Sequence, residues 1–461
     1  MSKVPISRVF ASLLALLAAG CAVGPGYHPP KPALPAAWTG PPEDAKLSSV
    51  TTQSSDLARW WNEMRDPTLT SLIEEALKAN LSIASAEASL REARALRGIA
   101  VAARLPSVTA TGSYQRESGP LEVEGGGSRN LFQAGFDAVW EMDIFGGIRR
   151  NVESATANVQ AAVENISNVH VSIAAEVALD YTQLRACQQE ATIARDNLKV
   201  QQQALEITRK LYQAGFDSGL DLAAAQTVVA SAEAQVPAYE TGARQSIYAL
   251  SVLLARNPGD LVERLTPLAP LPSIPAQIPA GLPSDLLRRR PDIRQAEAQL
   301  HSATAQIGVA VAQLFPQFSL TGGVNWQSSP GHAIFLGPVA SWPVFQGGAI
   351  VSNIHAQEAL RDVAFITYRQ TVLTALQDVE NALVAFAEEQ KHQKSLADAV
   401  AADRKNVALS DRLYQEGQNN LLTVLTAEAA LNADRVALTQ SAENLAADVI
   451  ALYKALGGGW N

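Results

Sequence analysis

Residues 317–327 read Gln317-Phe318-Ser319-Leu320-Thr321-Gly322-Gly323-Val324-Asn325-Trp326-Gln327, with apolar residues and one glycine at every second position. A period of two over about ten residues, with aromatic ends and a polar opposite face, is typical of a transmembrane β-strand. Residues 107–115 and 132–140 alternate in the same way, and residues 334–344 do so more weakly because Pro338 and Pro343 interrupt the donor row. The sequence therefore predicts β-hairpins at 107–140 and 317–344, although two soluble hairpins with one buried face remain the alternative.

Four strands do not close a barrel, and lipid does not tolerate an open sheet edge. The chain is therefore expected to oligomerise, and two, three or four copies would give roughly 8, 12 or 16 strands. Periodicity does not choose among these numbers. Asp137 and Asn325 fall on the polar side of their strands, so we expect them to face a water-filled lumen.

Two very long helical patterns follow the predicted hairpins. Positions seven apart form apolar-rich seams from Val163 to Tyr212 and from Phe365 to Tyr414, a period that demands supercoiling against neighbouring helices. No proline interrupts residues 147–215 or 348–417, so each pattern predicts one helix of roughly 65 residues, about 100 Å long. A Gly-containing turn and a returning helix complete coiled-coil hairpins at 147–255 and 348–456. Shorter helices are expected at 81–105 and 292–315, and the long helices should extend the barrel into the periplasm as a helical tube.

The chain is internally duplicated. Ile83, Glu87 and Pro106 recur about 210 positions later as Ile293, Glu297 and Pro316, and Leu211-Tyr212-Gln213 recurs as Leu413-Tyr414-Gln415. We therefore divide the chain into a first structural repeat at 61–256, a Pro-rich linker at 257–283, a second repeat at 284–456 and a tail at 457–461.

The N-terminus has the pattern of a secretory signal. Lys3 and Arg8 precede a short apolar run that ends in Ala18-Ala19-Gly20-Cys21, which predicts a signal peptide at 1–20 and a lipobox. Cleavage would leave Cys21 as an acylated first residue carrying palmitate or a similar chain, and residues 21–60 would form an extended, lipidated tether. An ordinary signal peptide that happens to precede a cysteine is the alternative. Because Ala22 is not Asp, an inner-membrane retention signal is absent and the outer membrane is favoured.

Several classes of function are disfavoured. The net charge is −9 with scattered Lys and Arg, so nucleic acid is an unlikely partner, and two Cys do not make a disulfide scaffold. No G-x-S-x-G, H-E-x-x-H, C-x-x-C or P-loop pattern occurs and the six His are dispersed. We therefore expect no enzyme, no metal and no cofactor other than the covalent lipid on Cys21. A structural coiled-coil outer-membrane lipoprotein is a competing class, but it would not need amphipathic strands.

Motifs along the chain resemble the TolC-like outer-membrane factors, specifically the NodT-type lipoproteins of efflux systems. They are Cys21-Ala22-Val23-Gly24-Pro25 with Tyr27, Trp60-Trp61 before Asp66-Pro67-Thr68-Leu69, Leu253-Leu254-Ala255-Arg256-Asn257-Pro258-Gly259, Leu287-Arg288-Arg289-Arg290-Pro291-Asp292, and Leu314-Phe315-Pro316. The resemblance implies a mainly α fold with transmembrane β, in which a homotrimer forms a twelve-stranded barrel and a periplasmic α-barrel. It also implies a lipid-anchored outer-membrane channel that works with a periplasmic adaptor and an inner-membrane resistance-nodulation-division transporter. A type I protein secretion conduit is the runner-up within the channel class.

The resemblance further implies a periplasmic gate at the helix tips, which relatives often line with acidic residues. Thr423 and Thr426 stand where those acids are found, so this chain departs from the acidic pattern at these two positions. Asp217 and Asp221 occupy the equivalent turn of the first repeat and remain gate candidates, together with Asn419 and Asn420. Helix capping is the alternative role for Asp and Asn at such turns.

Overall fold

The structure is a computed structural model that describes residues 22–40, 50–51, 57–119, 127–275, 278–328 and 331–460. The signal peptide expected at 1–20 and the acylation residue Cys21 lie outside this part of the chain. The chain divides into two compact units, and each takes segments from both repeats. Unit 1 comprises Met1–Pro32, Glu87–Asn165 and Asp292–Thr371, and unit 2 comprises Ala33–Ala86, Ile166–Pro291 and Val372–Asn461.

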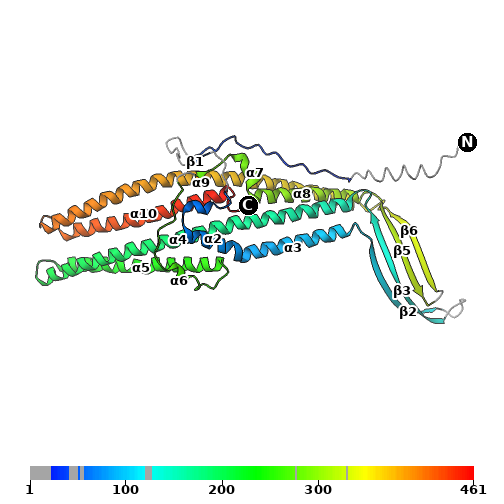
Figure 1. Ribbon diagram of the computed structural model, residues 1–461, viewed down its shortest axis with the longest axis horizontal. Helices are drawn as coiled ribbons and strands as arrows, with labels where there is room; N and C mark the ends of the chain where they lie inside the picture. Colours follow the sequence, from blue (N-terminus) through cyan, green and yellow to red (C-terminus); the bar gives the residue numbers. More distant parts are fainter. Residues whose placement is uncertain are drawn as a thin grey trace. The chain divides into compact units, whose positions relative to one another are not determined.

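Unit 1 contains one antiparallel four-stranded sheet (Figure 1). Its strands, in the order β2-β3-β5-β6, are β2 (Ser107–Gly119), β3 (Gly127–Met142), β5 (Gln317–Gln327) and β6 (His332–Ser341). Pairing between β3 and β5 joins the hairpins of the two repeats into one surface. The fourth strand begins and ends earlier than the predicted 334–344, so Pro343 lies beyond it. Pro338 lies within β6, which is an outer strand of the described sheet, and proline occurs more often in such strands than in central ones.

The helices before the hairpins are α3 (Leu81–Ala102) and α8 (Pro291–Ala312), each three residues shorter at its end than predicted. Pro106 and Pro316 explain the difference, because the residue before a proline disfavours helical backbone. The same hydrogen bond also occurs in each repeat, at the base of its β-hairpin. The indole nitrogen of Trp140 donates to the Arg104 carbonyl at 2.9 Å, and that of Trp342 donates to the Leu314 carbonyl at 3.1 Å.

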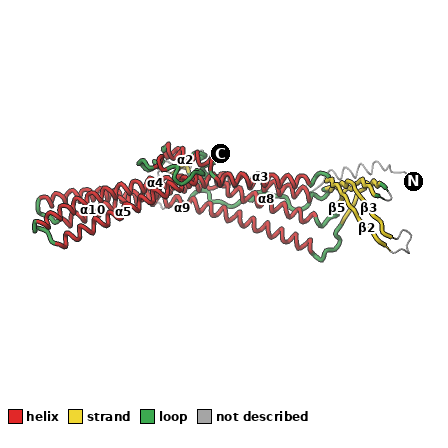
Figure 2. Tube along the Cα trace, turned by 90° about the horizontal axis from the view of Figure 1, so that it is seen from below, coloured by secondary structure: helices red, strands yellow, loops and turns green. Residues whose placement is uncertain are grey.

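The long helices have matching lengths in the two repeats. The first pair is α4 (Gly147–Gln213) with α5 (Gly219–Leu253), and the second is α9 (Ala349–Gln415) with α10 (Leu421–Ala455). Figures 1 and 2 show each long helix turning back along its partner. The seam positions Val177, Leu184, Val379 and Phe386 are fully buried, as the heptad period requires. None of the described helices is both long and apolar enough to cross a membrane.

Two short helices, η2 (Trp60–Met64) and α2 (Pro67–Ala79), contribute buried side chains to the core of unit 2. Trp60 is 2% exposed and stacks on Tyr453 with ring centroids 5.1 Å apart. Asp66 caps α2 by accepting hydrogen bonds from the backbone N–H groups of Thr68 and Leu69. The Trp-Trp and Asp-Pro-Thr-Leu motifs therefore serve packing and helix initiation.

The Pro-rich linker packs closely within unit 2. It contains α6 (Val262–Leu265) and β4 (Ile278–Pro279), which pairs with β1 (Val50–Thr51), and it leads into η3 (Pro283–Asp285) and α7 (Leu286–Arg289). The buried Arg185 side chain donates to the Pro267 carbonyl at 2.8 Å, and Gln188 donates to the Leu265 carbonyl at 2.8 Å. These bonds satisfy carbonyls that have no ladder partner, so the linker is fixed against α4.

Candidate functional site

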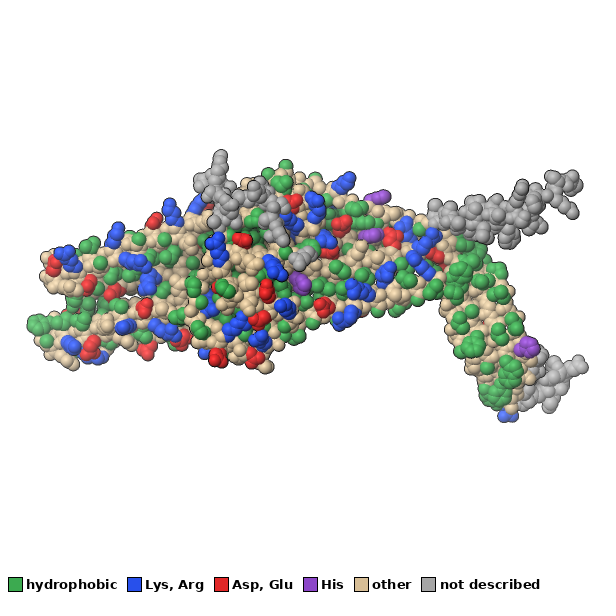
Figure 3. Space-filling model, in the orientation of Figure 1, with side chains coloured by type: hydrophobic (Ala, Val, Ile, Leu, Met, Phe, Trp, Pro, Cys, Tyr) green, Lys and Arg blue, Asp and Glu red, His purple; other side chains and the backbone are tan. Residues whose placement is uncertain are grey.

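The sheet of unit 1 has one apolar face that runs across all four strands. The register places Phe136 opposite Ala110 on one side and Val324 on the other, and Val324 lies opposite Ile334. These large side chains are exposed, Phe136 by 62% and Ile334 by 73%. Figure 3 shows hydrophobic side chains gathered over the strands. A contiguous exposed apolar surface of this kind needs a cover, such as lipid.

The opposite face of the same sheet carries the polar side chains. Asp137 accepts a hydrogen bond from the Thr111 hydroxyl at 3.2 Å and a long one from the Asn325 amide at 3.5 Å. Gly135 lies opposite Asn325, and a Cβ there would come within 1.8 Å of the Asn325 Oδ1 atom. The glycine therefore makes room for the polar pair. The structure thus brings Asp137 and Asn325 together on the face that the sequence assigned to a lumen.

The outer strands β2 and β6 each have one partner among the described strands. Both are long enough, at 13 and 10 residues, to present a row of backbone donors and acceptors on the other edge. The sheet is therefore an open segment with two faces of opposite character and two edges that need partners.

The turn between α4 and α5 in unit 2 holds Asp217 and Asp221. Ser218 is the N-cap of α5, and Asp221 completes a capping box by accepting from the Ser218 backbone N–H at 3.1 Å. The hydrogen bonds from Ser218 hold the pKa of Asp221 below its usual value. Burial and the negative charge of Asp217 raise the pKa of Tyr414, near the end of α9. Asp221 therefore caps α5, and Asp217 acts on the α9–α10 hairpin through its charge.

The corresponding turn between α9 and α10 is capped without an acid. Asn420 is the N-cap, and its side chain accepts from the Thr423 backbone N–H at 3.0 Å and from the Thr423 hydroxyl at 2.8 Å. The Thr426 hydroxyl donates to the Leu422 carbonyl, and Asn419 accepts from the Asn420 backbone N–H. All four residues therefore make local capping or backbone contacts.

Acidic pairs that sequence reasoning missed lie deeper in the α9–α10 hairpin. Burial and the Asp434 carboxylate raise the pKa of Asp403, and burial and Asp411 raise that of Glu428. Each pair joins residues at nearly equal distances from the turn at 417–420. Folding the two heptad patterns back about that turn would have found these pairs. Among the described residues, no group of three His, Cys, Asp or Glu is placed to hold a metal ion.

Comparisons with known proteins fit this geometry. The outer membrane efflux protein family matches residues 72–256 and 282–458. Nodulation protein T of Rhizobium leguminosarum bv. trifolii is 30% identical over 467 aligned residues, covering 99% of this chain and 98% of that protein. The toluene efflux pump outer membrane protein TtgC of Pseudomonas putida is 30% identical, covering 97% and 95%. The solved outer-membrane channel OprN superposes with a TM-score of 0.87 at 35% identity, covering 95% of this chain and 100% of that one.

Proposed function

This chain belongs to the outer membrane efflux protein family and is an outer-membrane efflux channel of the TolC-like fold, not an enzyme. From this premise we propose that three copies form a passive exit duct for small molecules. In this arrangement the sheets form a twelve-stranded barrel, and the long helices form a periplasmic tube. A periplasmic adaptor and a resistance-nodulation-division transporter of the inner membrane deliver the cargo.

The sheet in unit 1 carries this proposal. Its apolar face suits contact with lipid, its polar face around Asp137 and Asn325 suits a water-filled lumen, and its two open edges suit pairing with identical chains. Three chains with four strands each give an even-numbered barrel with no free edge. A structural coiled-coil lipoprotein would have no use for a sheet with these two faces.

Small molecules are the favoured cargo because the relatives with named cargo include a toluene efflux pump protein and an antibiotic efflux pump protein. A conduit for secreted proteins would have the same fold. The two differ in what leaves the cell.

Deleting the gene is expected to raise the cellular accumulation of at least one of ethidium, chloramphenicol and toluene severalfold. Without the duct, the pump has no exit through the outer membrane. Expression of the wild-type chain should restore the low level. Fluorescence or radiolabel uptake in energised cells measures this. A deletion strain that keeps normal accumulation but loses proteins from its culture medium would instead support secretion.

We further propose that Cys21 is acylated and anchors the chain to the outer membrane. The wild-type chain should incorporate radiolabelled palmitate, and Cys21→Ser should abolish the label while the protein remains in the outer-membrane fraction. The strands, not the acyl chains, hold most of the apolar surface for the membrane. A wild-type chain that takes up no label would contradict the lipobox.

The periplasmic gate is assigned to the turns around Asp217, Asp221, Asn419, Asn420, Thr423 and Thr426. Replacing both Asp217 and Asp221 by Asn removes two negative charges per chain from the narrow end of the channel. The preference for cations in planar bilayers should therefore fall about fivefold. Asn at 221 still accepts hydrogen bonds from Ser218, so thermal stability should change little.

Ser218→Ala is the matched control for the gate. It removes the cap hydroxyl and keeps both charges, so it should lower thermal stability and leave ion selectivity unchanged. Unchanged selectivity in the double Asp variant would assign both residues to helix capping alone.

A further inference from the structure

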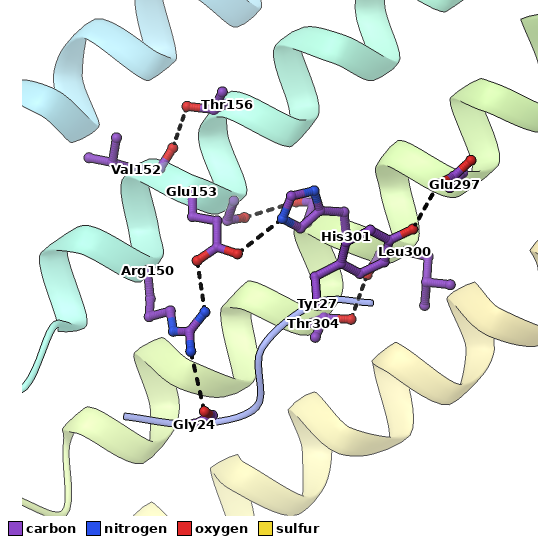
Figure 4. A network of polar contacts seen from close by, with 12 residues as sticks. Gly24, Tyr27, Arg150, Val152, Glu153, Thr156, Glu297, Leu300, His301 and Thr304 are labelled. Carbon is purple, nitrogen blue, oxygen red and sulfur yellow. Dashed lines mark hydrogen bonds and ion pairs between the residues drawn. The ribbon is translucent and has the colours of Figure 1, made fainter. Parts of the chain in front are cut away.

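Within unit 1, the first described residues lie against α4 and α8 (Figure 4). The Val23 backbone N–H donates to the Phe145 carbonyl at 3.0 Å. Arg150 on α4 donates from Nε to the Val23 carbonyl at 3.1 Å and from Nη2 to the Gly24 carbonyl at 3.2 Å. Its remaining nitrogen, Nη1, pairs with Glu153 at 2.8 Å. One buried guanidinium therefore holds two successive carbonyls of the N-terminal segment.

Two glycines allow the segment to approach this closely. Gly24 has φ +86°, and a Cβ at that position would come within 2.5 Å of the Gly308 Cα atom on α8. A Cβ on Gly308 would in turn come within 2.7 Å of the Arg150 Cγ atom. Gly24, Gly308 and the Arg150 stem are thus stacked in direct contact, and no side chain larger than hydrogen fits at either glycine without displacement.

Tyr27 makes the second point of attachment. Its ring stacks on His301 with centroids 4.2 Å apart, and its hydroxyl donates to Glu297 at 3.2 Å. Burial and the Glu297 carboxylate raise the pKa of Tyr27, so the hydroxyl stays protonated as a donor. His301 also contacts Glu153 at 3.0 Å. Although burial alone would raise the pKa of Glu153, hydrogen bonds from His301 and Arg150 hold it below its ordinary value.

The internal duplication shows that the set of residues contacting the N-terminal segment is not repeated at the equivalent positions. Equivalent positions in the two repeats are 210 residues apart for α3 and α8 and 202 residues apart for α4 and α9. The equivalent of Arg150 is therefore Ser352, that of Glu153 is His355, and that of His301 is Arg91. Gly98 is the counterpart of Gly308, yet a Cβ on Gly98 would meet no atom of the described residues within 4 Å. The equivalent positions on α3 and α9 therefore lack the same set of charges and the same close contact. A chain has one N-terminus, and one of the two sets of equivalent positions carries the residues that receive it.

We propose that these residues form an N-terminal latch that fixes residues 22–27 against α4, α8 and the turn that follows β3. The latch consists of residues 22–27 with Arg150, Glu153, Glu297, His301 and Gly308. Ala22 and Val23 are thereby held against Phe145 and Gly146. The segment that follows the proposed lipid anchor is therefore attached to one defined place on unit 1, and this part of the inference rests on the lipidation proposed above. All the contacts named above are made by protein atoms, so we expect the latch to form in the Cys21→Ser variant as well.

Spin-label mobility tests the latch in the full-length, detergent-extracted protein. The label is attached at His28→Cys, an exposed position just after the latch, in a Cys187→Ser background. The label should be immobile in this parent and equally immobile when Cys21→Ser is added. Gly24→Ala should raise the ratio of mobile to immobile label about tenfold, equivalent to about 1.4 kcal/mol. Gly26→Ala is the matched control, because a Cβ there meets nothing within 4 Å, and it should leave the spectrum unchanged.

A second pair of variants tests the latch by changing the helices instead of the N-terminal segment. Gly308→Ala should mobilise the label by displacing Arg150, whereas Gly98→Ala, its counterpart in the other repeat, should not. Both changes place alanine within a helix, where it is favoured over glycine, so loss of the helix would not explain a difference. A label that is already mobile in the parent, or equal spectra for Gly308→Ala and Gly98→Ala, would overturn the latch. Immobilisation that requires an intact Cys21 would also overturn it and assign the docking to the lipid.

Discussion

Phe136→Arg is expected to abolish insertion of the channel and, with it, export. Phe136 lies in the middle of the apolar face, opposite Ala110 and Val324, and is 62% exposed. An arginine at the bilayer midplane on the lipid face of a barrel costs about 2–4 kcal/mol. A trimer carries three copies, so the total of about 6–12 kcal/mol is as large as the whole unfolding free energy of many proteins, which is about 5–15 kcal/mol. Outer-membrane fractionation should show little inserted protein, and cells should accumulate ethidium as a deletion strain does.

Gln133→Arg is the control, since it introduces the same side chain three residues away on the polar face. Gln133 lies opposite Ser113 and Gln327, so the arginine should reach water and leave insertion intact. Equal loss of insertion in both variants would contradict the assignment of the two faces. Normal insertion of Phe136→Arg would contradict it too.

The sequence predicted the elements whose signals are local. Helices α4 and α9 follow from an unbroken heptad and the absence of proline, and their ends follow from Gly215 and Gly417. Strand β5 was predicted to the residue, because its alternation is clean over its whole length. The C-terminal ends of α3, α8 and β6 came earlier than predicted, and each lies shortly before a proline.

Non-local partners were harder to predict. The pairing of β3 with β5 joins segments about 190 residues apart, and no turn fixes it. The latch was missed because its parts lie on the N-terminal segment, α4 and α8, and His301 was seen only as one of six dispersed histidines. Arg150 has no sequence signal of its own. Its role follows from the backbone carbonyls that it reaches and from a glycine one helix away.

The second large effect concerns assembly. The edges of β2 and β6 leave several backbone N–H and C=O groups without partners within the described sheet. Each such group costs several kcal/mol in lipid, so a single inserted chain would lose far more than its folding free energy provides. Pairing the β6 edge of one chain with the β2 edge of the next removes that cost for every chain at once. Assembly and a folded barrel are therefore expected to be inseparable.

Native mass spectrometry of the wild-type protein, released from a mild detergent, tests the channel account most directly. We expect a single species with three times the mass of the mature chain. On dilution, no folded monomer should appear under any condition in which circular dichroism shows that the sheet is intact. Two or four chains would contradict the twelve-stranded barrel. A stable, monodisperse folded monomer would contradict the channel itself.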